Sequence, residues 1–246
     1  FFMFLAVIGF IAIAANDAVA QTNDAAAQEL LAGAASDAPV YQQIKAKFID
    51  GGVGFMAAVL LCLILGLAVA IERIIYLSLS TTNTSKLIAK VEDALANGGV
   101  EAALEVCRNT RGPVASIFYQ GLSRMDQGLE AVEKSVVSYG GVQAAQLETG
   151  LTWLSLFIAM SPNLGFLGTV IGMIGAFDAI QAAGDISPIV VASGIKVALI
   201  TTVAGLIVAL ILQVFFNYIT SKVESLVITM EDASVSLIDI LVKAKK

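Results

Sequence analysis

Long apolar runs separated by polar stretches dominate the chain. The runs at 54–79, 151–180 and 189–218 are each long enough, as helices rising about 1.5 Å per residue, to cross a hydrocarbon core of about 30 Å. A chain in lipid must satisfy its backbone hydrogen bonds internally, so runs of this kind form helices. The pattern therefore predicts an all-α, polytopic membrane protein with three spanning helices.

The stretches outside these runs define the other predicted segments. Residues 1–20 are an apolar, signal-like segment ending in the Ala-Val-Ala pattern of a cleavage site, or an extra N-terminal helix, and we expect the latter. Residues 21–53 and 181–188 are short segments with few basic residues. We expect residues 80–150 to form a polar helical domain and residues 219–246 to continue the third run as a C-terminal helix.

The C-terminal helix carries a second hydrophobic pattern. Its apolar residues alternate steps of four and three, the spacing of a coiled-coil seam. A helix of this kind in water needs a partner, which is either the polar domain or copies of the same helix. The seam residues are Ile219, Val223, Leu226, Met230, Ala233, Leu237 and Ile240.

The distribution of charge predicts the topology. Seven basic residues lie between Arg73 and Lys134 and four between Lys222 and Lys246, whereas the segment 181–188 has none. The positive-inside rule places the polar domain and the C-terminal helix in the cytoplasm, so 21–53 and 181–188 are predicted to be periplasmic. At the end of the first run, Glu72-Arg73 followed by Tyr76 suits the headgroup layer and predicts an interfacial anchor.

Composition narrows the function. The chain is 58% hydrophobic and 14% charged, with a mean hydropathy of +0.86, as expected of a membrane protein. A net charge of −6 argues against a nucleic-acid partner. With no His, the usual general base and most zinc chemistry are missing, and we expect neither an enzyme nor a metal or other cofactor. Cys107 is interpreted as a small buried hydrophobe.

Small residues form a stripe on each of the last two membrane helices. Such stripes let helix backbones approach closely, so the two helices are predicted to pack as a tight hairpin. Such stripes are explained equally well by helix packing alone and by the lining of a channel. The residues concerned are Gly165, Gly168, Gly172 and Gly175 on the second helix, and Gly194, Ala198 and Gly205 on the third.

The segment 161–177, SPNLGFLGTVIGMIGAF, resembles the P-LLGLLGTVxGMIxxF signature of the MotA/TolQ/ExbB proton-channel family, the ExbB branch above all. Asn163 and Phe166 stand where the family usually has Leu, and the resemblance covers about 54–230. It implies a subunit of an inner-membrane motor driven by proton-motive force that energises a TonB-like protein for outer-membrane transport. It also implies a homopentamer around a dimer of an ExbD-like single-pass subunit that carries an intramembrane Asp.

Four residues are predicted to line a pore: Thr169, Thr201, Thr202 and Val197. A hydroxyl both donates and accepts, so it supports a water chain in a dry channel. The alternative is that each Thr bonds back to a carbonyl one turn earlier. The resemblance aligns Thr169 and Thr202 with threonines of the family's permeation path. It also puts Val197 where ExbB-like members often have Glu, so any carboxylate must come from another subunit.

Lys196 is a cation within the third membrane helix. It either snorkels to the outer headgroups or forms a gating salt bridge, with Asp178 or with a carboxylate of a partner. Two other functions stay open. One is a TolQ-like, gliding or flagellar-type stator subunit, and the other is a non-conducting oligomeric membrane scaffold.

Overall fold

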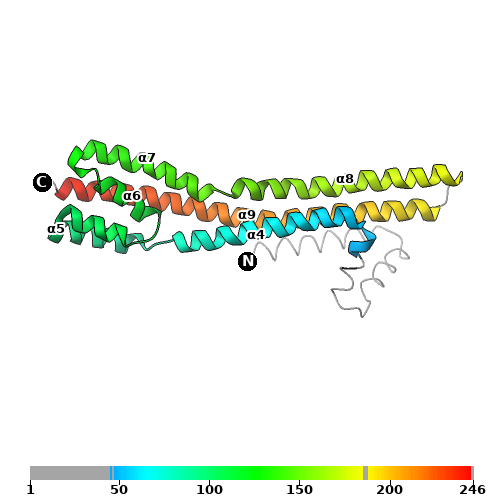
Figure 1. Cartoon of the computed structure of the whole chain (residues 1–246), viewed down its shortest axis with the longest axis horizontal. Coiled ribbons are helices and arrows are strands. Elements are labelled where there is room, and N and C mark those ends of the chain that lie inside the picture. Colours follow the sequence, from blue (N-terminus) through cyan, green and yellow to red (C-terminus); the bar gives the residue numbers. More distant parts are fainter. Residues whose placement is uncertain (1–44, 46, 185–187, 245–246) are drawn as a thin grey trace, which may run out of the picture. The chain divides into compact units, whose positions relative to one another are not determined.

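The computed structural model describes residues 45, 47–184 and 188–244 (Figure 1). In that range the chain is helical and contains no strand, so the all-α prediction is confirmed. The expectation for residues 1–20 falls outside the described residues. The elements are α4 (Val53–Ser80), α5 (Thr84–Arg108), α6 (Pro113–Leu122), the 3-10 helix η1 (Met125–Gln127), α7 (Leu129–Glu148), α8 (Leu151–Ala183) and α9 (Pro188–Ala244).

Three stretches of the described chain, which include α4, α8 and α9, are long and apolar enough to cross a membrane. This confirms the predicted number of spanning helices. Their most apolar windows are only 22%, 22% and 28% buried within the chain, so most of this surface is left for lipid or other subunits. α8 continues through Pro162, and α9 joins the predicted third membrane helix and the C-terminal helix in one element.

The chain divides into two units. Among the described residues, one comprises those up to Val59 together with those of 164–205, and the other comprises Leu60–Asn163 together with those from Leu206 onward. The second unit contains the polar helical domain, α5 to α7. Two glycines with positive φ shape it: Gly99 breaks α5 into two helical pieces, and Gly112 precedes Pro113 at the start of α6. Both are backbone conformations that glycine adopts at little cost.

The coiled-coil seam of α9 is buried within the chain. All seven seam residues are less than 9% exposed. At Leu237 the neighbour is α6, because a Cβ built on Gly121 would lie 3.3 Å from the Leu237 side chain. Of the two partners the sequence left open, the polar domain therefore covers α9 at Leu237.

Cys107 on α5 is buried as well. Its side chain is 3% exposed, and loss of hydration by burial raises the pKa of the thiol to about 11. Cys62 on α4 is also buried, and neither cysteine forms a disulfide. Cys107 therefore packs as the small hydrophobe that the sequence predicts.

Candidate functional site

The two small-residue stripes bring α8 and α9 into close contact. A Cβ on Gly165 would lie 2.9 Å from the Thr201 carbonyl oxygen and 3.0 Å from Thr202 Cα, and both of these atoms belong to the backbone. A Cβ on Gly168 would lie 2.9 Å from Thr201 Oγ1. Only glycine allows this approach, which is the physical basis of small-residue packing between membrane helices.

The contact continues one turn further along both helices. A Cβ on Gly172 would lie 3.2 Å from the Ala198 Cβ, and one on Gly194 would lie 2.5 Å from the Ala176 Cβ. The two remaining predicted packing residues differ: Gly205 is buried, whereas a Cβ on Gly175 would meet no atom of the described chain within 4 Å. Gly175 therefore takes no part in the contact between α8 and α9.

Thr169 and Thr202 meet at the centre of this contact. Their hydroxyl groups form a short hydrogen bond to each other, from α8 to α9. Thr169 Oγ1 also lies 3.1 Å from the Ala198 carbonyl on α9, and Thr202 Oγ1 lies 3.1 Å from the Gly165 carbonyl on α8. Bonds back to each helix's own carbonyls are longer, at 3.3 Å for Thr169 and 3.4 Å for Thr202.

The pair has two protons and therefore two possible arrangements. In one, Thr169 donates to Thr202, which donates to the Gly165 carbonyl. In the other, Thr202 donates to Thr169, which donates to the Ala198 carbonyl. The two carbonyls lie at the same distance, 3.1 Å, so both directions are within hydrogen-bonding reach. A hydroxyl that can reverse its donor and acceptor roles is what a hydrogen-bonded proton path requires.

Thr201 lies in a different environment from the other two threonines. It is 1% exposed, and its hydroxyl donates to the Ala198 carbonyl on its own helix at 2.7 Å. Its side chain fills the space opposite Gly168. The back-bonding alternative raised from the sequence therefore describes Thr201 best, while Thr169 and Thr202 bond mainly across the helix pair.

Lys196 pairs with an acid that the sequence analysis did not consider. Its Nζ lies 3.0 Å from Asp50 Oδ2, rather than beside Asp178, which is exposed on α8. The turn that follows Asp50 packs on the same helix, since a Cβ on Gly51 would lie 2.9 Å from the Ile200 side chain. The sequence showed only that one acid precedes the first membrane helix and that Lys196 lies in the outer part of the third, which does not by itself pair the two residues.

Val197 is half-buried beside the same turn, with its Cγ1 3.8 Å from a Cβ built on Gly52. On α9, whose residues 188–244 are described, no carboxylate replaces the missing Glu, because the first acid of this helix is Glu224. Among the described residues, no group of three or more His, Cys, Asp or Glu side chains is arranged to hold a metal ion. The site is therefore a pair of hydroxyls in a tightly packed, apolar helix contact.

Comparison with known proteins places this arrangement in a family. The model of the MotA/TolQ/ExbB proton channel family matches residues 109–232, which is half of the chain and contains both threonines of the pair. The chain belongs to the MotA/TolQ/ExbB proton channel family. Among its relatives, an ExbB-like biopolymer transport protein of Synechocystis sp. is 31% identical over 71% of this chain and 70% of the relative.

Other relatives share the ExbB name. A biopolymer transport protein ExbB homologue of Methanothermobacter thermautotrophicus is 35% identical over 65% of this chain, and the match spans 57% of that relative's length. The biopolymer transport protein ExbB of Xanthomonas campestris pv. campestris is 37% identical over 46% of this chain and 43% of its own. In fold, this family member is similar to C. jejuni MotAB, with a TM-score of 0.54 and 17% identity over 96% of this chain and 86% of the other.

Proposed function

We propose that this chain is the ExbB-like subunit of an ion channel and motor of the bacterial inner membrane, driven by proton-motive force. Membership of the proton channel family supports conduction in general, and the similarity to proteins named ExbB supports this branch. In this proposal the polar domain 80–150 and the C-terminal helix are cytoplasmic, as the distribution of basic residues predicts.

The observation that carries the proposal is the Thr169–Thr202 pair. Two hydroxyls that bond across a helix contact and can reverse direction provide one link of a proton path. They cannot provide the whole path, because a proton relay needs a titratable group and position 197 holds a Val. We therefore place the acid on a partner, an ExbD-like single-pass subunit with an intramembrane Asp, present as a dimer inside a ring of five copies of this chain. The assembly would energise a TonB-like protein for outer-membrane transport.

Proton flux in vesicles tests this proposal. The chain is co-purified with its partner, reconstituted, and assayed with a pH-sensitive dye after a potential is imposed. Thr169→Val and Thr202→Val keep the side-chain shape and remove one hydroxyl each, and each is expected to lower the flux at least about tenfold, since a missing hydroxyl leaves a gap in the path. Native mass spectrometry checks that both variants still assemble.

Ser161→Ala is the matched control. Ser161 is a buried hydroxyl on the same helix, but it bonds only to the Phe157 carbonyl of α8, at 2.8 Å. Its removal should leave the flux unchanged. If both Thr variants conduct like wild type while fully assembled, the hydroxyl pair is not part of a path and the proposal fails.

A non-conducting scaffold is the second candidate. It is favoured by the fact that both hydroxyls of the pair are satisfied by each other and by two backbone carbonyls, so they need no water. The scaffold predicts an oligomer without the single-pass partner and without flux from the wild-type protein. Identifying the proteins that co-purify also separates a TonB-linked role from a TolQ-like or flagellar-type stator.

A further inference from the structure

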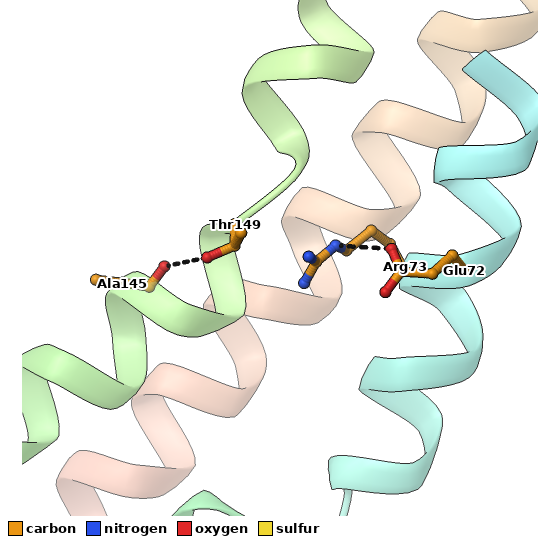
Figure 2. A network of polar contacts seen from close by, with 4 residues as sticks. All are labelled: Glu72, Arg73, Ala145 and Thr149. Atoms are coloured by element: carbon orange, nitrogen blue, oxygen red, sulfur yellow. Dashed lines mark hydrogen bonds and ion pairs between the residues drawn. The ribbon is translucent and has the colours of Figure 1, made fainter. Parts of the chain in front are cut away.

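Arg73 of α4 lies beside the joint between α7 and α8 (Figure 2). Its side chain is 13% exposed, although it comes from α4 and carries a full charge. Its Nε is 3.2 Å from the carboxylate of Glu72, and its guanidinium lies 5.4 Å from the centre of the Tyr76 ring. Within the described chain Nε nevertheless finds no acceptor in hydrogen-bonding geometry.

Such burial costs free energy. A charged group removed from water is tolerated when it is paired and fully hydrogen-bonded, and Arg73 meets this condition only in part. Glu72 is 58% exposed, so the pair gains little from it. A buried and incompletely satisfied group needs a reason for its position.

The joint itself supplies that reason. α7 ends at Glu148 and α8 starts at Leu151, with Gly150 between them at φ +88°. A Cβ on Gly150 would lie 2.6 Å from Arg73 Nε and 3.3 Å from its Cζ. The guanidinium thus occupies the space that a side chain at position 150 would need.

Helix-end electrostatics do not explain this placement. The carbonyl end of α7 attracts a cation, whereas the amide end of α8 repels one, and both ends lie at the joint. Thr149 already closes the last turn of α7 by donating to the Ala145 carbonyl at 3.1 Å. What remains is the packing of a planar group against a glycine backbone.

We infer that Arg73 is a positioning residue that holds the bend between α7 and α8 by filling the space beside Gly150. It links three elements at one point: the membrane helix α4, the last helix of the polar domain and the start of the membrane helix α8. If Arg73 leaves this space, Gly150 is free to change its backbone angles and the bend loses its fixed geometry.

Spin-label distances across the joint test the inference in the full-length protein. Labels are attached to cysteines introduced at the exposed positions Val142 on α7 and Leu156 on α8, with unlabelled protein added so that only pairs within one chain contribute. The native Cys62 and Cys107 are buried and should stay unlabelled. Wild type should give one narrow distance distribution, and Arg73→Ala, which empties the space beside Gly150, should broaden it at least about twofold.

Matched variants separate positioning from general stability. Glu72→Gln removes the exposed half of the ion pair and should leave the distribution narrow. Gly150→Ala should lower the unfolding midpoint more in the wild-type background than in the Arg73→Ala background, because the nearest atom of the clash is Arg73 Nε, which Arg73→Ala removes. Gly128→Ala is the control for backbone strain alone, because Gly128 has a φ of +100° but a Cβ built on it would meet no atom of the described residues within 4 Å. Its effect on the unfolding midpoint should be the same in both backgrounds.

Two results would overturn the inference: an unchanged narrow distribution in Arg73→Ala, or equal effects of Gly150→Ala in both backgrounds. If Arg73→Ala does not accumulate, Arg73→Ser replaces it, since its short side chain also ends before the space beside Gly150. None of these measurements needs a partner or a proton gradient, so they stand apart from the proposed function.

Discussion

Replacing single glycines of α8 by alanine should reveal how closely α8 and α9 must pack. In Gly165→Ala the new Cβ would meet backbone atoms of α9 at 2.9 and 3.0 Å, whereas ordinary contact begins at 3.4 Å. Backbone cannot rotate away, so the helices must separate by roughly 0.5 Å. The bond from Thr202 to the Gly165 carbonyl, now 3.1 Å long, would then stretch to about 3.6 Å and be lost.

The expected magnitude follows from these two effects. Overpacking costs about 1–3 kcal/mol, and the lost hydrogen bond adds about 1 kcal/mol. Alanine also gains up to about 1 kcal/mol of helix propensity over glycine. That gain cancels when Gly165→Ala is compared with Gly175→Ala, because both sit inside α8 and Gly175 has open space beside it. The difference in free energy of unfolding between the two variants should therefore be about 2–4 kcal/mol, with Gly165→Ala the less stable.

Equilibrium unfolding in mixed micelles with increasing sodium dodecyl sulfate measures this difference. Gly172→Ala should fall between the two, since its nearest neighbour, the Ala198 Cβ, lies farther away at 3.2 Å and a smaller separation of the helices relieves the overlap. The reasoning is refuted if Gly165→Ala is as stable as Gly175→Ala, because the close backbone contact would then be absent in the protein.

Two further predictions concern the polar domain. Burial raises the pKa of the Cys107 thiol from its ordinary 9.0 to about 11, so at pH 8 its thiolate fraction should be about 100-fold below normal and the thiol should resist maleimide in the folded protein. Mass spectrometry should show rapid labelling only after denaturation, and equal labelling rates in both states would contradict the burial. Leu237→Ala should lower the free energy of unfolding by about 2–5 kcal/mol, because the Leu237 side chain is 0% exposed. Val235→Ala should lower it by less than about 1 kcal/mol, because Val235 is 62% exposed. If chemical unfolding gave similar decreases for the two variants, the seam would not face the core.

Features set by local periodicity could be predicted from the sequence, and features set by distant contacts could not. The spacing of Gly165, Gly168 and Gly172 identified the face of α8 that meets α9. The seam of α9 predicted an apolar face, but periodicity does not say which surface covers it. The ion pair of Lys196 with Asp50 joins residues far apart in the chain, so no local pattern reveals it.

The same limit applies to the chemistry of the site. The sequence placed Thr169 and Thr202 on neighbouring helices, yet their direct hydrogen bond depends on the relative rotation of α8 and α9. Likewise, the position of Arg73 at the end of a membrane helix predicted that it lies in the headgroup layer. Its packing against Gly150 depends on the bend between α7 and α8, which the sequence does not reveal.

The buried seam also sets the order in which the protein can fold. The core of the polar domain combines residues such as Val132, made early, with residues such as Leu237, made about 105 positions later. At about 5–20 residues per second, synthesis of the intervening chain takes about 5–20 s. During that interval the membrane portions of α8 and α9 must enter the bilayer, and the apolar face of the domain stays uncovered. The polar domain can therefore complete its core only after the last two membrane helices have been inserted. A chain that fails to insert them exposes an incomplete core to chaperones and proteases.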